Sequence, residues 1–180
     1  MLKRIMVIGV SSGVGKSTFS KELGSILDIP VYHLDALYWE PNWIEASLEK
    51  FSKAQQEIVE REQWITDGNY SHTFKIRTQA ADTIIYLELP LSVCLYRVVK
   101  RWIMNIGKTR PDMAEGCKEK IDWDFIKFIS TTYYPRKRKI AQLFQHIQAS
   151  KARKNIITLK SKQEIQVYLE ETKQNHNDMT

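Results

Sequence analysis

Short apolar runs alternate along the chain with stretches in which apolar residues recur at helical spacing. Phe19, Leu23, Ile26 and Leu27, for example, fall on one face of a helix that residues 28–30 should end. The apolar runs predict five strands, over residues 3–9, 30–33, 63–67, 83–88 and 155–159. Further helices are predicted over residues 48–59, 91–102, 122–133 and 136–149, and after a capping-box pattern at 161–164. Strands separated by helices predict an α/β protein with a doubly wound, mostly parallel five-stranded sheet.

The first apolar run leads into the most specific motif of the chain. Residues 3–9 are followed by Val10-Ser11-Ser12-Gly13-Val14-Gly15-Lys16-Ser17-Thr18, which has the strand, loop and helix layout of a phosphate-binding P-loop. Glycines let the backbone N–H groups turn toward phosphate oxygens, and the helix start adds its positive dipole end. The strict pattern would place a glycine at Val10, and Gly9 lies one residue early.

The motif predicts a binding site for ATP and Mg²⁺. Lys16 is expected to reach the β- and γ-phosphates, and the Ser17 hydroxyl is expected to bind the metal ion. The residues expected to contact ATP within the loop are Ser12, Gly13, Val14, Gly15, Lys16, Ser17 and Thr18. The alternative is a glycine-rich turn that ends in Lys-Ser by chance.

Composition restricts the class of protein. The chain has 180 residues, 43% apolar and 27% charged, which is ordinary for one globular domain, here expected over residues 1–172 with a polar tail at 173–180. No run approaches the ~18 apolar residues of a membrane span. Cys94 and Cys117 lack metal-type spacing, so we expect free thiols, no zinc and a cytoplasmic location. The net charge of +6 suits polyphosphate or nucleic-acid ligands without choosing between them.

Basic residues surround a segment that carries glycine and proline with little periodicity, residues 103–120. Arg97 and Arg101 lie one helical turn apart just before it, Arg110 lies within it, and Arg136 follows it. Enzymes that transfer phosphoryl groups need cations that close over the γ-phosphate. We therefore expect a lid that clamps phosphate, the alternative being a solvated basic face.

Two aspartates are candidates for catalysis. Asp67 closes a strand expected beside the P-loop strand, where its carboxylate could hold Mg²⁺ through water. Asp35 is expected at the end of the second strand, where it could act as a general base toward a substrate hydroxyl. The alternatives are an Asp-Gly turn for Asp67 and a helix-cap or turn residue for Asp35.

Other side chains near these aspartates have a structural and a functional interpretation. Trp39 and Tyr70 could stack on a planar substrate or fill the core, and His33 is expected to be a packed strand residue. Glu88 lies at a strand end, where an acidic residue could bind the metal ion. The Leu89-Pro90 turn that follows favours a different interpretation, in which this segment leads into the lid.

The run Tyr86-Leu87-Glu88-Leu89-Pro90, followed by Arg97 and Arg101, resembles the lid entry of adenylate kinases. Asp67-Gly68 is similar to part of that family's Asp-Gly-x-Pro-Arg motif, which implies that Gly68 belongs to the acceptor site. The arginine of the motif is missing, so Arg77 could substitute for it, or the acceptor could lack a phosphate.

The chain resembles more closely the adenylate-kinase-related topology modulation proteins of bacteria. Four blocks carry this resemblance, residues 33–43, 64–70, 81–85 and 109–117. The resemblance spans about residues 4–170 and implies a P-loop fold with nucleoside-monophosphate-kinase-like topology and a small lid insertion.

Three functions are compatible with these observations. The favoured one is an ATP-dependent kinase for a nucleotide or another small acceptor, with Lys16, Asp35, Asp67, Arg101 and Arg136 as catalytic residues. Its acceptor site is expected to include Asp35, Trp39, Gly68, Tyr70, Arg77 and Arg110. The alternatives are an ATP-dependent regulator that acts on DNA through the basic surface, although no nucleic-acid reader motif is present, and an inactive nucleotide-binding module. The protein is expected to be a monomer or a homodimer without membrane contact.

Overall fold

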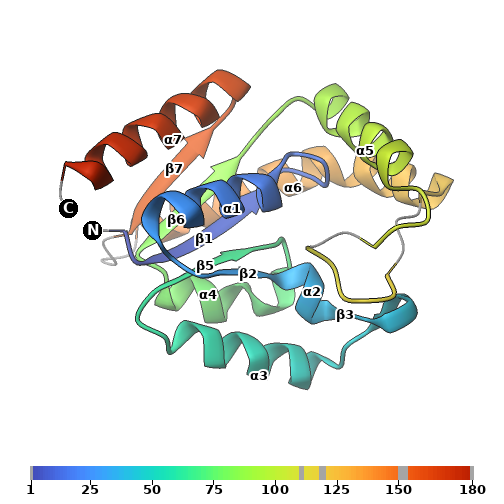
Figure 1. The fold of residues 1–180 in the computed structure, drawn as a ribbon, viewed down its shortest axis with the longest axis horizontal. Coiled ribbons are helices and arrows are strands. Elements are labelled where there is room, and N and C mark those ends of the chain that lie inside the picture. The colour runs from blue at the N-terminus through green and yellow to red at the C-terminus, as the bar shows by residue number, and fades with distance from the viewer. Residues whose placement is uncertain (1, 110–111, 118–120, 150–153, 179–180) are drawn as a thin grey trace.

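Five parallel strands form the central sheet of the computed structural model, which describes residues 2–109, 112–117, 121–149 and 154–178. The strands are β1 (Arg4–Gly9), β2 (Val31–His33), β5 (Trp64–Asp67), β6 (Thr83–Leu87) and β7 (Asn155–Leu159). Their spatial order is β2-β5-β1-β6-β7 (Figure 1). All five strands predicted from the sequence are therefore confirmed, as is the parallel α/β fold.

The three central strands are buried almost throughout. Only Arg4, at the start of β1, is exposed among the residues of β1, β5 and β6. Strands covered by helices on both faces are expected to be continuously apolar rather than alternating, as residues 5–8 and 84–87 are. The parallel register aligns Val7 with Asp67 and Gly9 with Leu87, so these strands end together at one edge of the sheet. Ligands of open α/β sheets bind at this edge.

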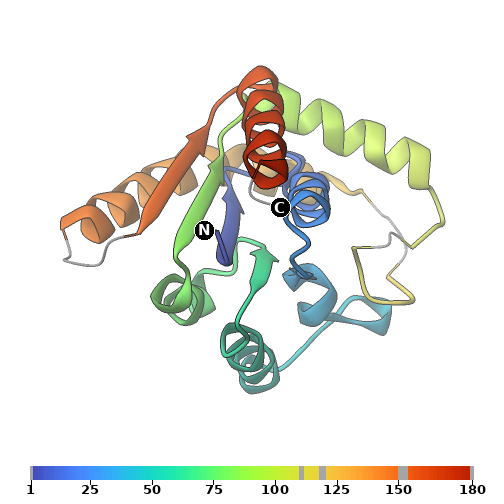
Figure 2. The same ribbon diagram turned by 60° about the vertical axis from the view of Figure 1, so that its left-hand side comes forward.

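Helices cover both faces of the sheet, as Figure 2 shows. On one face lie α1 (Lys16–Leu27) and α7 (Lys162–Asn177), and on the other lie α4 (Phe74–Ala80) and α6 (Trp123–Ala149). Helix α3 (Leu48–Val59) packs against α4, and α5 (Leu91–Asn105) packs against α6. No helix among the described residues is long and apolar enough to cross a membrane.

Several short elements escape sequence prediction because each is only two to seven residues long. Besides α4, they lie between β2 and α3 and after β5. They are α2 (Leu34–Tyr38), the antiparallel pair β3 (Trp39–Glu40) and β4 (Ile44–Glu45), and the 3₁₀ turns η1 (Pro41–Trp43) and η2 (Ser71–Thr73). A single turn of helix shows no helical periodicity, so only tertiary packing reveals it.

Helix α6 corrects the prediction of two helices separated by Pro135. It is continuous from Trp123 to Ala149, with Pro135 inside it. Proline removes one intrahelical hydrogen bond and usually breaks a helix. Here both halves are held by packing: Ile129 and Ile140 are buried on either side, and the buried Tyr133 donates its hydroxyl proton to the Leu89 carbonyl oxygen at 2.9 Å.

The last helix also extends farther than its polar composition suggests. Helix α7 continues through residues 173–177 of the predicted tail. Ser161 caps its start by accepting from the Glu164 amide at 3.0 Å, which confirms the capping box. Because Leu169 is buried and Tyr168 packs against Phe19 of α1, the middle of the helix is docked against the rest of the protein.

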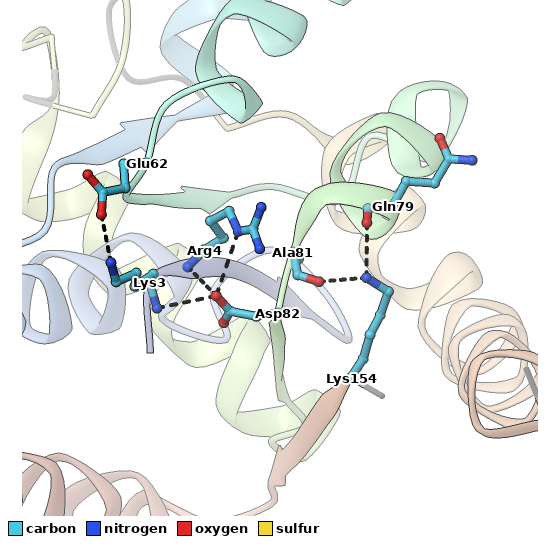
Figure 3. Close-up of polar contacts among 7 residues, drawn as sticks. All are labelled: Lys3, Arg4, Glu62, Gln79, Ala81, Asp82 and Lys154. Carbon is cyan, nitrogen blue, oxygen red and sulfur yellow. Dashed lines mark hydrogen bonds and ion pairs between the residues drawn. The ribbon is translucent and has the colours of Figure 1, made fainter. Parts of the chain in front are cut away.

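Side chains tie the strands together at the amino edge of the sheet, opposite the P-loop (Figure 3). One oxygen of Asp82 accepts hydrogen bonds from the amides of Lys3 and Arg4, at 3.3 and 2.8 Å. Lys154 donates to the carbonyl oxygens of Gln79 and Ala81 at the end of α4. This edge is cross-linked by residues with structural partners, whereas the candidate catalytic residues gather at the other edge.

Candidate functional site

The loop between β1 and α1 has the backbone of an anion-binding turn. Gly13 and Gly15 have φ angles of 77° and 103°, in the left-handed region that favours glycine. A side chain at Gly13 would also overlap the Cys94 carbonyl oxygen and approach Val98 of α5 within 2.8 Å. Val10, which replaces the expected first glycine, is buried, and its amide donates to Leu87 of β6 at 2.9 Å. The loop therefore starts from a residue that is still hydrogen-bonded to the sheet.

Lys16 begins α1 directly after the loop. Its ammonium group donates to the Ser11 carbonyl oxygen at a long 3.4 Å. Burial lowers the pKa of Lys16, while the nearby carboxylates of Asp35 and Asp67 raise it. A half-buried cation with one long hydrogen bond is suited to bind an anion, and phosphate would supply the missing partners.

A cavity of about 680 Å³ opens over this loop. All seven loop residues expected to contact ATP line it, and so do Arg97, Arg101 and Asp35. Arg97 also donates to the Val14 carbonyl oxygen at 3.0 Å, which ties α5 to the loop. The sequence analysis missed the cavity wall formed by Lys162 and Ile165 of α7, because these residues carry no motif.

Asp35 lies in the first turn of the short helix α2, which corrects its expected position at the end of a strand. The Tyr70 hydroxyl donates to Asp35 Oδ1 at 2.7 Å, and burial, together with this charged partner, raises the pKa of Tyr70. The carboxylate is thus held by one oxygen at the wall of the cavity. This geometry is suited to a general base.

Asp67 ends β5 beside the P-loop strand, as predicted, but it does not line the cavity. Its side chain is buried, and Oδ2 lies 2.9 Å from His33 Nδ1. His33 is a half-buried residue of β2, in agreement with its expected structural role. One carboxylate oxygen of Asp67 is therefore engaged by the protein, and metal binding by this residue stays a prediction.

Arg77 is fully buried, which corrects the expectation that it faces an acceptor phosphate. Its guanidinium donates to the carbonyl oxygens of Gly68 and Tyr70, at 3.1 and 2.9 Å, and lies over the Phe74 ring. Burial lowers the pKa of Arg77 to about 9, so it is charged at neutral pH. Arg77 holds the loop that positions Tyr70, and through Tyr70 it orients Asp35.

Gly68 is likewise a packing residue in this loop. Its φ angle is 144°, and a side chain there would come within 2.9 Å of Leu34 Cβ in α2. The glycine lets β5 end in close contact with the helix that carries Asp35.

Removing the Arg77 guanidinium is expected to destabilise the protein. In Arg77→Leu the carbonyl oxygens of Gly68 and Tyr70 lose their charged donor inside the core, a loss of about 2–3 kcal/mol in the free energy of unfolding. Urea denaturation measures this loss. Arg138→Leu, at an exposed position of α6, is the matched control and should change stability by less than about 0.5 kcal/mol. Equal stability of the two variants would contradict the structural role of Arg77.

Asn69 is a further residue that sequence reasoning missed. Its side-chain amide donates to the Gly9 carbonyl oxygen at 2.7 Å, and its oxygen accepts from the Gly9 amide at 3.0 Å. This pair of bonds joins the loop after β5 to the last residue of the P-loop strand. An asparagine after Asp-Gly would ordinarily indicate only a turn, so the sequence carried no distinguishing signal.

The remaining predicted residues occupy different surroundings. Trp39 and Tyr70 belong to an aromatic cluster with Tyr38, Trp43 and Phe51, with ring centroids 4.6–5.4 Å apart, and neither lines the cavity over the loop. Arg110 lies outside the described residues. Glu88 is paired with Lys137 at 2.9 Å rather than turned toward the P-loop.

The described part of residues 103–120 lies near β3 and α2 (Figure 1). The buried Cys117 donates its thiol proton to the Glu40 carbonyl oxygen at 3.2 Å, and Gly116 lies close to Pro41. Asp112 of this segment lines the cavity over the P-loop, together with Asn105 at the end of α5. The described part of the segment therefore borders the site that it was predicted to cover.

The site contains few protein ligands for a metal ion. Among the described residues there is no cluster of three or more histidine, cysteine or acidic side chains that could hold one. Mg²⁺ in nucleotide sites usually keeps several waters and binds phosphate oxygens with one or two protein groups. Ser17, at the cavity wall in the first turn of α1, fits this sparse donor set.

The solved structures with a similar fold include small-molecule kinases. Shikimate kinase from Bacteroides thetaiotaomicron matches with a TM-score of 0.57 and 16% identity, covering 97% of this chain and 98% of that one. Shikimate kinase from Aquifex aeolicus matches with a TM-score of 0.55 and 16% identity over 96% and 97% of the two chains. A gluconokinase from Sinorhizobium meliloti matches with a TM-score of 0.53 and 16% identity over 98% and 93%.

The chain has the fold of these P-loop kinases. No protein-family model and no curated protein sequence matches it. The agreement extends over nearly the whole length of both chains.

Proposed function

We propose that this protein is an ATP-dependent phosphotransferase that acts on a small molecule. The observation that carries the proposal is the position of Asp35 on the wall of the same cavity that the P-loop lines. A phosphate-binding loop alone would be compatible with ATP hydrolysis or simple binding. A carboxylate held by Tyr70 across from Lys16 adds a group that can accept a proton from an attacking hydroxyl.

Each residue has a defined part in the transfer. The loop amides and Lys16 bind the phosphates of ATP, and the Asp35 carboxylate takes the proton of the acceptor hydroxyl. The acceptor oxygen forms its bond to the γ-phosphorus as the bond from that phosphorus to the leaving ADP oxygen breaks. When bound with ATP at Ser17, Mg²⁺ supplies charge neutralisation on the phosphate oxygens.

Arginines near the P-loop supply positive charge for the transferred phosphoryl group. Arg97 and Arg101 of α5 line the cavity and are suited to bind the negative charge that spreads over the transferred group. Arg136 contacts the start of the loop through the Val10 carbonyl oxygen, at 3.4 Å. Asp67 and Arg110 keep their predicted roles, in metal binding and in the lid, as parts of the proposal.

The alternative of a DNA-acting regulator has less support. The basic residues around the P-loop line a cavity and contact the loop, as a kinase requires, and the similar solved structures include kinases. The resemblance of four sequence blocks to topology modulation proteins stays a prediction about ancestry.

Formation of ADP from ATP tests the proposal. Purified protein is incubated with ATP, Mg²⁺ and a panel of nucleosides, nucleotides, sugars, hydroxy acids and short DNA. We expect one class of small molecule to stimulate ADP release and to be recovered in phosphorylated form. Stimulation by DNA without a phosphorylated product would favour the regulator instead.

A further inference from the structure

A second cavity lies next to the P-loop, on the opposite face of the sheet from α1. It has a volume of about 340 Å³ and opens between α6 and the segment from Asn69 to α4. Phe74, Ile140 and Leu143 form apolar walls, and Asn69, Arg136 and Lys139 are among its polar residues. An apolar hollow with a few converging polar groups is the usual form of a small-molecule site, and this volume is near the lower end of their range of about 300–1,000 Å³.

The charges of this cavity are unbalanced. Arg136 is half-buried, and its contacts are one long hydrogen bond to the Val10 carbonyl oxygen and the face of the Phe128 ring. Burial lowers the pKa of Arg136. In the described part of the chain no carboxylate contacts Arg136 or Lys139, whereas the neighbouring Lys137 is paired with Glu88. Two cations beside apolar walls are complementary to an organic anion.

The cavity borders the start of the P-loop. Asn69, at its rim, is bonded to both backbone groups of Gly9, and Arg136 contacts Val10, so two of its polar residues touch the start of the P-loop. Tyr70 lies between the rim residues Asn69 and Ser71, and its hydroxyl holds Asp35. A molecule in this cavity therefore lies beside two residues that contact the start of the P-loop, in the chain segment that carries the partner of the proposed base.

We propose that this cavity binds the anionic end of the phosphoryl acceptor, which is a small hydroxyl compound bearing a carboxylate or a phosphate ester. The inference rests on the proposed kinase function and specifies its substrate class. The guanidinium of Arg136 and the ammonium of Lys139 bind the anion, and the apolar walls contact the carbon skeleton. Arg77, the residue expected from the sequence to bind an acceptor phosphate, is replaced in this role because it is buried beneath the loop.

Matched ligands test the charge requirement without depending on turnover. Glucose, gluconate and glucose 6-phosphate share a carbon skeleton and present a neutral, a carboxylate and a phosphate form, and further hydroxy acids and phosphate esters are paired with neutral analogues. Binding is measured by calorimetry in the absence of ATP. We expect an anionic member to bind at least about tenfold more tightly than its neutral counterpart. The carboxylate and phosphate arms identify which anion is preferred.

Two variants place the binding in this cavity. Leu143→Trp fills the apolar hollow and should abolish the preference for the anion, and Lys139→Gln should weaken anion binding about tenfold or more. Gln142→Trp and Arg138→Gln, at exposed positions of the same helix, are the matched controls, and circular dichroism verifies that each variant is folded.

The proposal is overturned if no anionic ligand binds better than its neutral analogue, or if Leu143→Trp leaves that preference intact. ATP affinity measured on the same samples keeps the two proposals apart. Loss of the anion preference with normal ATP binding refutes only the substrate class, whereas a wild-type protein that does not bind ATP refutes the kinase.

Discussion

Asp35→Asn is expected to lower the rate of phosphoryl transfer by about 10²–10⁴-fold and to leave ATP affinity at neutral pH unchanged. The amide keeps the shape of the side chain and can still accept the Tyr70 hydrogen bond, so the fold around α2 should persist. What it loses is the ability to take the proton of the acceptor hydroxyl. Transfer to an identified acceptor and ATP calorimetry, on the same preparation, measure the two quantities.

Asp67→Asn is the comparison that separates the two aspartates. If Asp67 acts on the metal ion, its variant should be impaired to a degree that depends on Mg²⁺ concentration, whereas the defect of Asp35→Asn should not. The structure sharpens this comparison, because Asp67 is buried against His33 and Asp35 lines the cavity. Loss of ATP binding in Asp35→Asn alone would reverse the assignment of base and metal ligand.

Lys16→Ala is expected to reduce the affinity for ATP about tenfold or more, since a charge-assisted hydrogen bond contributes ~1.5–3 kcal/mol. Lys16 is well suited to a large effect: it is desolvated, and its one hydrogen bond in the protein is long. Calorimetric titration with ATP and Mg²⁺ measures the change.

Lys53→Ala is the matched control for Lys16, because Lys53 is an exposed residue of α3 that does not line the P-loop cavity. It should bind ATP as the wild type does. Equal affinity of Lys16→Ala and the wild type would exclude the P-loop as the site of the phosphates.

The strands and the helices illustrate where local patterns are sufficient and where they are not. The five strands and the main helices were predictable because each carries enough apolar residues at one period to identify it. Pro135 was misleading because a proline does destabilise the interior of a helix. Here the burial of Ile129 and Ile140 on either side outweighs this cost. A short stretch of sequence shows the cost of the proline to the helix, but it does not show the tertiary packing that offsets this cost.

The residues of the candidate site also fall into two groups, those that a local pattern identified and those that depend on tertiary packing. The P-loop residues were identified from sequence because glycine at φ > 0 followed by Lys-Ser is a local requirement of phosphate binding, met within nine residues. Asn69 was missed and Arg77 was misassigned, because what each contacts depends on how separate segments pack.

The amino-acid sequence by itself determined the parallel α/β fold and the phosphate-binding loop, since both follow from short-range apolar periodicity and glycine stereochemistry. Only the tertiary structure decided that Asp35 faces the P-loop cavity, that Asp67 is held by His33, and that Arg77 is buried beneath the loop. The physical reason is that burial and hydrogen bonding of a polar side chain depend on strands and helices brought together from distant parts of the chain. An arginine that binds phosphate and one that binds buried carbonyl groups have the same local sequence signature.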